Sequence, residues 1–167
     1  MDQTQLYHSG RLTDGWQLFG AHPATEGGVH GWWFNVWAPR AKAVSVVGDF
    51  NGWDPEETPL APKGEFWQGF LPDLPAYTSY KYAVTGQDGR VRYKADPYGF
   101  HTETRPGTAS KLTKLDFTFD DTAWMERRDK CRNRPLNIYE LHAGSWKHKP
   151  GATRPDGSDG WYNYEEL

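Results

Sequence analysis

The sequence has little of what stabilises or targets many proteins. Cys131 is the only cysteine among 167 residues, so no disulfide can form within the chain. No stretch approaches the roughly 18 consecutive apolar residues of a membrane span. The opening MDQTQLYHSGRL has no basic segment followed by an apolar one, as a secretory signal would. We therefore expect a cytoplasmic protein without a membrane partner.

The sequence also has little net charge. The formal value is −3, which provides no electrostatic attraction for nucleic acid or for an anionic membrane. The six histidines have no ligand spacing, and a single cysteine cannot build a zinc site. We predict no nucleic-acid partner, no metal and no cofactor.

The residues Leu, Ile, Val and Phe, which form most protein cores, are scarce as well. Leu, Ile, Val and Phe total 27 of 167 residues, a share that indicates disorder when it accompanies a high net charge. Here the charge is low, and nine Trp and nine Tyr supply large rings that can be buried. We therefore predict a folded chain with an aromatic core. Rings of this kind also suit flat ligands.

Five short runs rich in aromatic and β-branched residues begin at Trp32, with turn signals between them. Runs of this length and spacing predict an all-β, immunoglobulin-like antiparallel sandwich. In the fourth run, alternation places Tyr80 and Tyr82 on one face and Lys81 on the other. The runs are WWFNVWAP, AVSVVG, EFWQGFL, YKYAV and RVRYK.

Three local signals predict further elements. Asp88-Gly89 predicts a hairpin between the last two runs, because two successive positive-φ positions favour Asp and then Gly. Alternating apolar residues predict a strand within residues 112–119. An Asp N-cap before good helix formers predicts a short helix over residues 122–129.

The sequence GDFNGWD, residues 48–54, places a tryptophan at a glycine-marked turn. The indole of Trp53 can cover the C–H face of a sugar ring. Asn51 and Asp49 are near enough in sequence to bind the sugar hydroxyls. The alternative is that Trp53 folds back on the core, where tryptophan is common.

Several motifs resemble the glycogen-binding β-sandwich module at the front of glycogen branching enzymes. They are WAPRAKAVSVVGDFNGWD, YKYAV, KADPYGF and PGTAS, in that order. NIYELHAGSW is similar to the strand that opens the catalytic barrel of those enzymes, and GWYNYEEL to the approach to its first helix. The resemblance extends from Leu18 to Leu167. Its GSW ending favours branching enzymes over isoamylases and trehalose-releasing hydrolases.

The resemblance implies an N-terminal α-glucan-binding module followed by a C-terminal stub of an incomplete (β/α)8 barrel. We expect the chain to be a fragment, because one strand and part of a helix cannot bury their own apolar face. The predicted segments are an irregular lead-in with room for a short strand at its edge (1–31), a sandwich (32–120), a short helix and linker (121–135) and a truncated barrel start (136–167).

The resemblance also implies the residues that bind sugar. Trp53 matches the tryptophan after the FN turn, and Lys81 matches the lysine of the YK strand. Tyr93 stands three residues before Asp96-Pro97, where related modules often carry a second tryptophan, and a phenol is a smaller platform than an indole. With Asn51, these residues are predicted to bind α-1,4-glucan, either glycogen or a maltooligosaccharide.

Two other functions stay open. The module could brace the rest of the catalytic barrel, its expected partner, without binding sugar itself. The chain could also be an enzyme that uses Glu140, His142 and Asp96. Glu140 and His142 would share one face of a strand, but we expect them to form a buried, hydrogen-bonded structural pair.

The resembling enzymes are transferases whose retaining chemistry needs two carboxylates about 5 Å apart. Such carboxylates lie at the C-terminal ends of barrel strands, and the resemblance places them after Leu167. We therefore predict no catalytic residue in this chain and no branching activity by this polypeptide alone, although its parent protein is predicted to be a glucanotransferase.

Overall fold

The computed structural model describes residues 3–131, 135, 137–153, 159–162 and 165–166. They divide into two compact units, Met1–Phe117 and Thr118–Leu167, each described here by itself. Among the described residues, no helix is both long enough and apolar enough to cross a bilayer.

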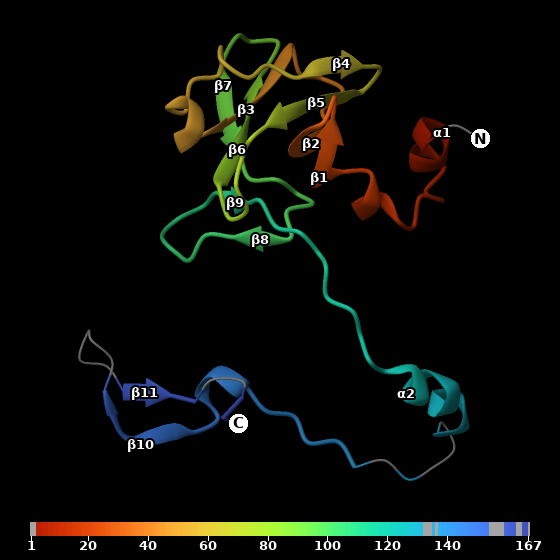
Figure 1. The fold of residues 1–167 in the computed structure, drawn as a ribbon, viewed down its shortest axis with the longest axis vertical. Coiled ribbons are helices and arrows are strands. Elements are labelled where there is room, and N and C mark those ends of the chain that lie inside the picture. Colours follow the sequence, from red (N-terminus) through yellow and green to blue (C-terminus); the bar gives the residue numbers. More distant parts are fainter. Residues whose placement is uncertain (1–2, 132–134, 136, 154–158, 163–164, 167) are drawn as a thin grey trace. The chain divides into compact units, whose positions relative to one another are not determined.

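The first unit contains two antiparallel sheets (Figure 1). One has the strand order β1-β2-β5-β4; the other has the order β3-β6-β9-β8, and β7 also pairs with β6. This arrangement confirms the all-β class. The first sheet consists of β1 (Gly20–Glu26), β2 (Val29–Trp37), β4 (Ala61–Lys63) and β5 (Phe66–Pro72), and the second of β3 (Ala43–Gly48), β6 (Ser79–Thr85), β7 (Val91–Lys94), β8 (His101–Thr102) and β9 (Ser110–Lys111).

The core between the sheets is built from rings and valines, as the composition predicts. Phe34 of β2 meets Tyr80 of β6 edge to face, with ring centroids 5.3 Å apart. Val44 and Val46 of β3 are fully buried beside them. Tyrosine can replace aliphatic residues in this core because its hydroxyl finds a buried partner, which is described below.

All five predicted strand runs are strands in the structure: β2, β3, β5, β6 and β7. The hairpin at Asp88-Gly89 is also present, since β6 pairs with β7, but its turn differs from the prediction. Only Gly89 has positive φ (73°), and the Gly86 N–H donates to the Arg90 carbonyl at 3.0 Å. This bond closes a three-residue loop with a left-handed glycine, the next commonest hairpin connection.

The segment predicted as an irregular lead-in contributes a helix and a full strand. Helix α1 (Gln3–His8) contacts the rest of the unit through Tyr7, whose ring lies 5.3 Å from Phe19 and 5.4 Å from Trp37. Strand β1 pairs with β2 over seven residues. It includes Pro23, which a sheet tolerates at its edge because proline has no N–H to donate.

The predicted strand at residues 112–119 is wrong. The structure has only the two-residue β9 before it, and residues 112–120 are irregular. The side chains of Leu115, Phe117 and Phe119 are 61%, 78% and 73% exposed. Alternation alone does not make a strand, because the backbone also needs a neighbouring edge with which to exchange hydrogen bonds.

The second unit begins with the predicted helix, α2 (Thr122–Arg127), which continues as a 3-10 turn to Cys131. A hairpin of β10 (His148–Thr153) and β11 (Asp159–Trp161) follows. The rings of His148 and Trp161 lie 4.0 Å apart across it.

The predicted barrel strand NIYELHAGSW is not a strand. Its described residues 137–142 are irregular, and Ala143–Ser145 forms a 3-10 turn. A first barrel strand is hydrogen-bonded by neighbours on both sides, and none pairs with this segment among the described residues. The helix expected from YNYEEL includes residues 163, 164 and 167, which lie outside the described residues.

Glu140 and His142 are therefore not the buried pair that the sequence predicts. Both side chains are exposed, and the His142 Nδ1 hydrogen-bonds the Ser145 hydroxyl at 2.6 Å. The prediction assumed a strand, which would have placed the two residues on one buried face. The irregular backbone observed here neither aligns the two side chains on one face nor buries them.

Candidate functional site

The turn after β3 is held in shape by the side chain of Asn51. Gly48 ends the strand, and Asp49–Asn51 forms one 3-10 turn. The Asn51 Oδ1 accepts from the Gly48 N–H at 3.0 Å, while its Nδ2 donates to the Val46 carbonyl at 3.1 Å and the Thr58 hydroxyl at 2.7 Å. Asn51 thus shapes the loop, and its contact with sugar stays a prediction.

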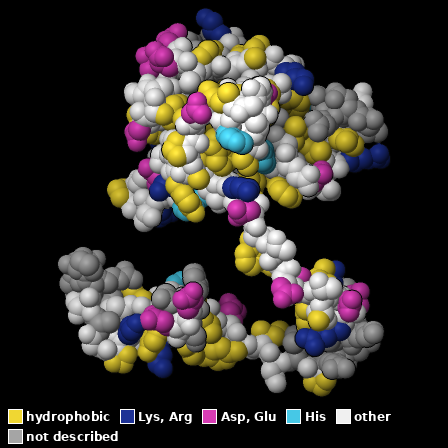
Figure 2. Space-filling model, viewed as in Figure 1, with side chains coloured by type: hydrophobic (Ala, Val, Ile, Leu, Met, Phe, Trp, Pro, Cys, Tyr) yellow, Lys and Arg dark blue, Asp and Glu magenta, His cyan; other side chains and the backbone are white. Residues whose placement is uncertain are grey.

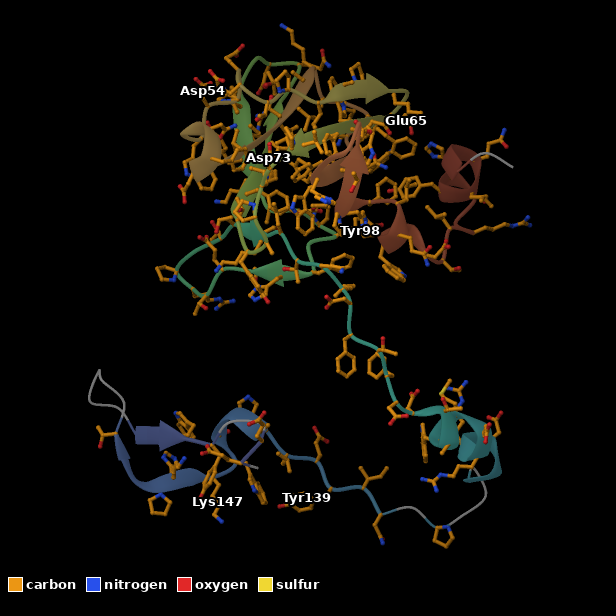
Figure 3. The ribbon with its side chains drawn as sticks, in the orientation of Figure 1. Asp54, Glu65, Asp73, Tyr98, Tyr139 and Lys147 are labelled. Atoms are coloured by element: carbon orange, nitrogen blue, oxygen red, sulfur yellow. The ribbon has the colours of Figure 1, made fainter. Side chains whose placement is uncertain are left out.

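Trp53 ends this turn in an unusual backbone conformation, just before Asp54, which is labelled in Figure 3. Its φ of 62° lies in the left-handed region, which costs a residue with a side chain about 1–2 kcal/mol. Its N–H donates to the Gly48 carbonyl at 2.9 Å, and its indole N–H donates to the Asp49 Oδ1 at 2.7 Å. The side chain is half-buried. The indole is therefore oriented at one edge while part of its surface meets solvent.

Strand register places Lys81 and Tyr93 on one face of the second sheet. Ala83 pairs with Ser45 on one side and with Tyr93 on the other, so these three residues form a row across the sheet. Lys81, two residues before Ala83, points to the same side. It lies diagonal to Tyr93 at about 7 Å, within reach of long side chains. The structure thus answers a question of register that the sequence leaves open.

This face has small residues at its floor and polar groups above it. Ala83 is 1% exposed, whereas Tyr93 is 49% exposed. The Lys81 ammonium donates to the Thr108 hydroxyl at 2.7 Å, a bond that limits its motion. Sequence reasoning missed Thr108, because only the pairing of β8 with β9 brings its loop back to β6.

The turn that carries Trp53 begins beside Lys81. Gly48, the last residue of β3, pairs with Tyr80 of β6, the neighbour of Lys81 in sequence. The structure thus brings Lys81 of β6 and Tyr93 of β7 together on one face, and the Trp53 turn starts from β3, the other neighbour of β6. Trp53, Lys81 and Tyr93 are called the Trp53 site below.

A buried carboxylate holds β6 from the core side. The Asp96 Oδ2 accepts from the hydroxyls of Tyr80 at 2.6 Å and Tyr82 at 3.2 Å, and its Oδ1 accepts from the Tyr98 N–H at 2.8 Å. Burial raises the pKa of Asp96, and the three hydrogen bonds oppose that rise. Asp96 is 7% exposed, so a substrate has no access to it.

The predicted turn at Asp96-Pro97 is present, with Tyr98 packed after it. The Gly99 N–H donates to the Asp96 carbonyl at 3.1 Å. The Tyr98 ring, labelled in Figure 3, lies 5.1 Å from the ring of Phe19. Asp96 thus joins a core strand to this turn, and Tyr98 joins the turn to the segment that precedes β1.

We expect Tyr80 and Tyr82 to stay protonated until the protein unfolds in alkali. Burial, followed by the nearby Asp96 carboxylate, raises the pKa of both hydroxyls well above 10.0. Because the pKa is higher in the folded state, this contribution to stability is full below pH 10 and is lost as the pH rises further. Tyrosinate absorbance should show a late phase that coincides with unfolding. Tyr80→Phe and Tyr82→Phe should each remove one tyrosinate from it, and a smooth titration of all tyrosines near pH 10 would contradict this expectation.

Charge around the first unit is dispersed. Figure 2 shows Lys, Arg, Asp and Glu side chains in small groups over its visible face, without a large patch of one sign. Among the described residues, no three His, Cys, Asp or Glu side chains gather as metal ligands would. The arrangement offers aromatic surface and hydrogen bonds instead of strong charge.

Comparison with known proteins gives the family context. Residues 18–99 match the model of carbohydrate-binding module 48, described as the isoamylase N-terminal domain. The chain is 43% identical to the 1,4-alpha-glucan branching enzyme GlgB of Butyrivibrio fibrisolvens, a match that covers 99% of the chain and 26% of that enzyme. It is also 43% identical to the GlgB of Oleidesulfovibrio alaskensis over 97% of the chain. The chain therefore spans about a quarter of the length of the curated relatives it matches.

A solved structure, the Klebsiella pneumoniae pullulanase complexed with maltotriose, matches with a TM-score of 0.47. Its sequence identity is 22%, over 60% of this chain and 10% of that one. A likeness this distant locates no site.

Proposed function

We propose that the region containing residues 18–99, which belong to the carbohydrate-binding module 48 family, binds α-1,4-glucan through the Trp53 site. The relatives support the proposal that the chain is the N-terminal part of a branching enzyme. We propose that the parent protein transfers α-1,4-glucan segments to form branches, in the cytoplasm. We also propose that residues 136–167 begin its catalytic barrel, which is then the partner of this module.

The observation that carries the sugar site is the register of β6. It puts an ammonium, Lys81, and an exposed phenol, Tyr93, on one outward face beside the turn of Trp53. A glucosyl unit presents C–H groups on its faces and hydroxyls at its rim. Aromatic rings match the former and an N–H donor the latter. No carboxylate or phosphate is needed for such a match.

The site is small, so we expect weak binding to short chains. The indole is only half-exposed, and a phenol replaces a second indole. A dissociation constant on the order of 1 mM for a maltooligosaccharide corresponds to about −4 kcal/mol, which suits two partial ring contacts and one charged donor.

Replacing Trp53 with alanine tests the proposal. We expect Trp53→Ala to weaken maltoheptaose binding at this site at least about tenfold, or about 1.4 kcal/mol, because the largest apolar contact is lost. The measurement is a titration followed by amide and indole resonances in ¹⁵N-labelled protein. Trp124→Ala is the matched control, since it removes an exposed indole from the second unit. Unchanged affinity in Trp53→Ala would remove the Trp53 site from the proposal.

The other two functions have less support. The family match favours sugar binding over a module that only braces the barrel. A self-contained enzyme would need Asp96, whose carboxylate is buried against two tyrosines, together with Glu140 and His142, which are exposed in the other unit. We therefore keep the prediction that this chain alone has no branching activity.

A further inference from the structure

We infer that the outer face of the first sheet carries a second carbohydrate-binding groove, separate from the Trp53 site. This inference rests on the proposed function, since it assigns the same polymer to another surface. The groove has a volume of about 260 Å³. Sites for drug-sized ligands are about 300–1,000 Å³, so this one suits a single sugar ring. It is lined by Gln17, Leu18, His22, Trp33, Asn35 and Gln68.

The groove is a direct product of strand register. His22 of β1 pairs with Trp33 of β2, and Asn35 of β2 pairs with Gln68 of β5. Alternation sends Phe34, the residue between Trp33 and Asn35, into the core. The four pairing residues therefore share the face that points away from the second sheet. Gln17 and Leu18 reach the groove from the segment that leads into β1.

Trp33 supplies the aromatic wall. Its side chain is 36% exposed, although it lies in the middle of a paired strand. The ring of Phe70 meets it edge to face at 6.4 Å, which supports the indole. A supported indole with an open side can cover the C–H groups of a glucosyl unit.

The polar lining consists of neutral groups. Gln17, Asn35 and Gln68 carry amides, each with donors and an acceptor, as sugar hydroxyls also have. The His22 Nε2 donates to the Phe19 carbonyl at 2.9 Å, which leaves its Nδ1 as an acceptor while the ring is neutral. Within the described part of the chain, no Asp, Glu, Lys or Arg lines the groove. This composition favours an uncharged polyhydroxyl ligand over phosphates, nucleotides or charged peptides.

Asn35 adds an acceptor whose capacity is unmet. Its Nδ2 donates to the Leu18 carbonyl at 3.1 Å, but its buried Oδ1 has no hydrogen-bond partner among the described residues. Buried polar atoms in folded proteins are nearly always paired. Because this atom is closed to solvent, a ligand hydroxyl would provide the missing donor only after a lining side chain moves aside.

Two sites on opposite outer faces would engage two strands of one branched polymer. Because the first site holds the polymer near the second, binding to glycogen should exceed binding to a short oligosaccharide by more than the sum of the two sites. A short chain that cannot pass around the sandwich should not show this gain.

The test follows indole and amide resonances of ¹⁵N-labelled protein during titration with maltotriose. We expect the Trp33 indole and the Gln68 side-chain amide to shift together with one dissociation constant. Trp33→Ala should abolish the Gln68 shift while it leaves the Trp53 titration within about twofold. Gln68→Ala, a milder change, should weaken the Trp33 response at least about fivefold, in the range found when a hydrogen-bonding partner is removed. Trp37→Ala is the matched control, because it removes a similarly exposed indole from the same face of β2, outside the groove.

The outcomes separate the two proposals. A shift of Trp53 without Trp33 overturns the second groove alone. A shift of Trp33 without Trp53 supports the groove and overturns the Trp53 site. No response from either indole overturns both, and concentration-dependent line broadening at Trp33 without any sugar response would identify this face as a protein contact, which also overturns the groove.

Discussion

Asp96→Ala is expected to lower the free energy of unfolding of the first unit by about 2–4 kcal/mol. The substitution leaves the hydroxyls of Tyr80 and Tyr82 and the N–H of Tyr98 without their acceptor. Each buried donor without a partner costs about 1–3 kcal/mol. The substitution also removes the cost of burying the Asp96 carboxylate, but this gain offsets only part of the cost of the unpaired donors. The whole free energy of unfolding of a folded domain is about 5–15 kcal/mol, so the loss should be a large fraction of it.

Urea denaturation followed by circular dichroism measures the change. Tyr82→Phe is the matched control, since it removes one donor at 3.2 Å and leaves the acceptor in place; its expected cost is about 1 kcal/mol. In the Asp96→Ala, Tyr82→Phe double variant the two losses should not add, because they remove one interaction. A loss below about 1 kcal/mol in Asp96→Ala would show that water replaces the carboxylate at little cost.

Gly48→Ala is expected to destabilise the same unit by about 3 kcal/mol and to weaken glucan binding at the Trp53 site. A Cβ at this position would lie 2.4 Å from the Ser79 carbonyl oxygen and 2.5 Å from the Phe50 ring. The carbonyl belongs to the backbone of β6, so it can move away only if β3 and β6 separate. Overpacking of this kind costs about 1–3 kcal/mol or more, and it displaces the turn that carries Trp53.

Gly52→Ala is the matched control in the same turn. Gly52 has a φ of 61°, but no atom lies within 4 Å of an added Cβ. The expected cost is therefore conformational alone, about 1 kcal/mol. Thermal unfolding and maltoheptaose titration of both variants measure the two effects. Equal stability of the two variants would show that the contact at Gly48 relaxes without separating the strands.

Strands β6 and β3 were predictable from sequence because the order of their residues shows which face is buried. In β6, buried Tyr80 and Tyr82 alternate with Lys81, and in β3 a run of valines is buried on both faces. Strand β1 gave no such signal. It has Pro23 in its middle, and its stability depends on pairing with β2 instead of on its own apolar residues. Segment 112–119 shows the reverse case, since its apolar residues alternate with polar ones but its backbone is irregular.

The candidate sites also contain residues that the sequence identifies and arrangements that only the fold reveals. Trp53, Lys81 and Tyr93 could be named from motifs, because each belongs to a short sequence with a local meaning. Whether Tyr93 faces Lys81 depends on the pairing of Ala83 with Tyr93, a relation between residues on two strands that neither strand encodes alone. The groove at Trp33 takes lining residues from four separate segments, so only the folded arrangement reveals it.

The backbone at position 53 sets stability and recognition against each other. Glycine would adopt the same left-handed geometry without penalty, as it does one residue earlier, but it would lose the half-buried indole and its hydrogen bond to Asp49. Relief of the backbone and loss of the indole therefore act on stability in opposite directions, whereas a selection for glycogen capture would retain the tryptophan. Engineering the module for both qualities calls for reinforcement elsewhere, in the core or along the sheet edges.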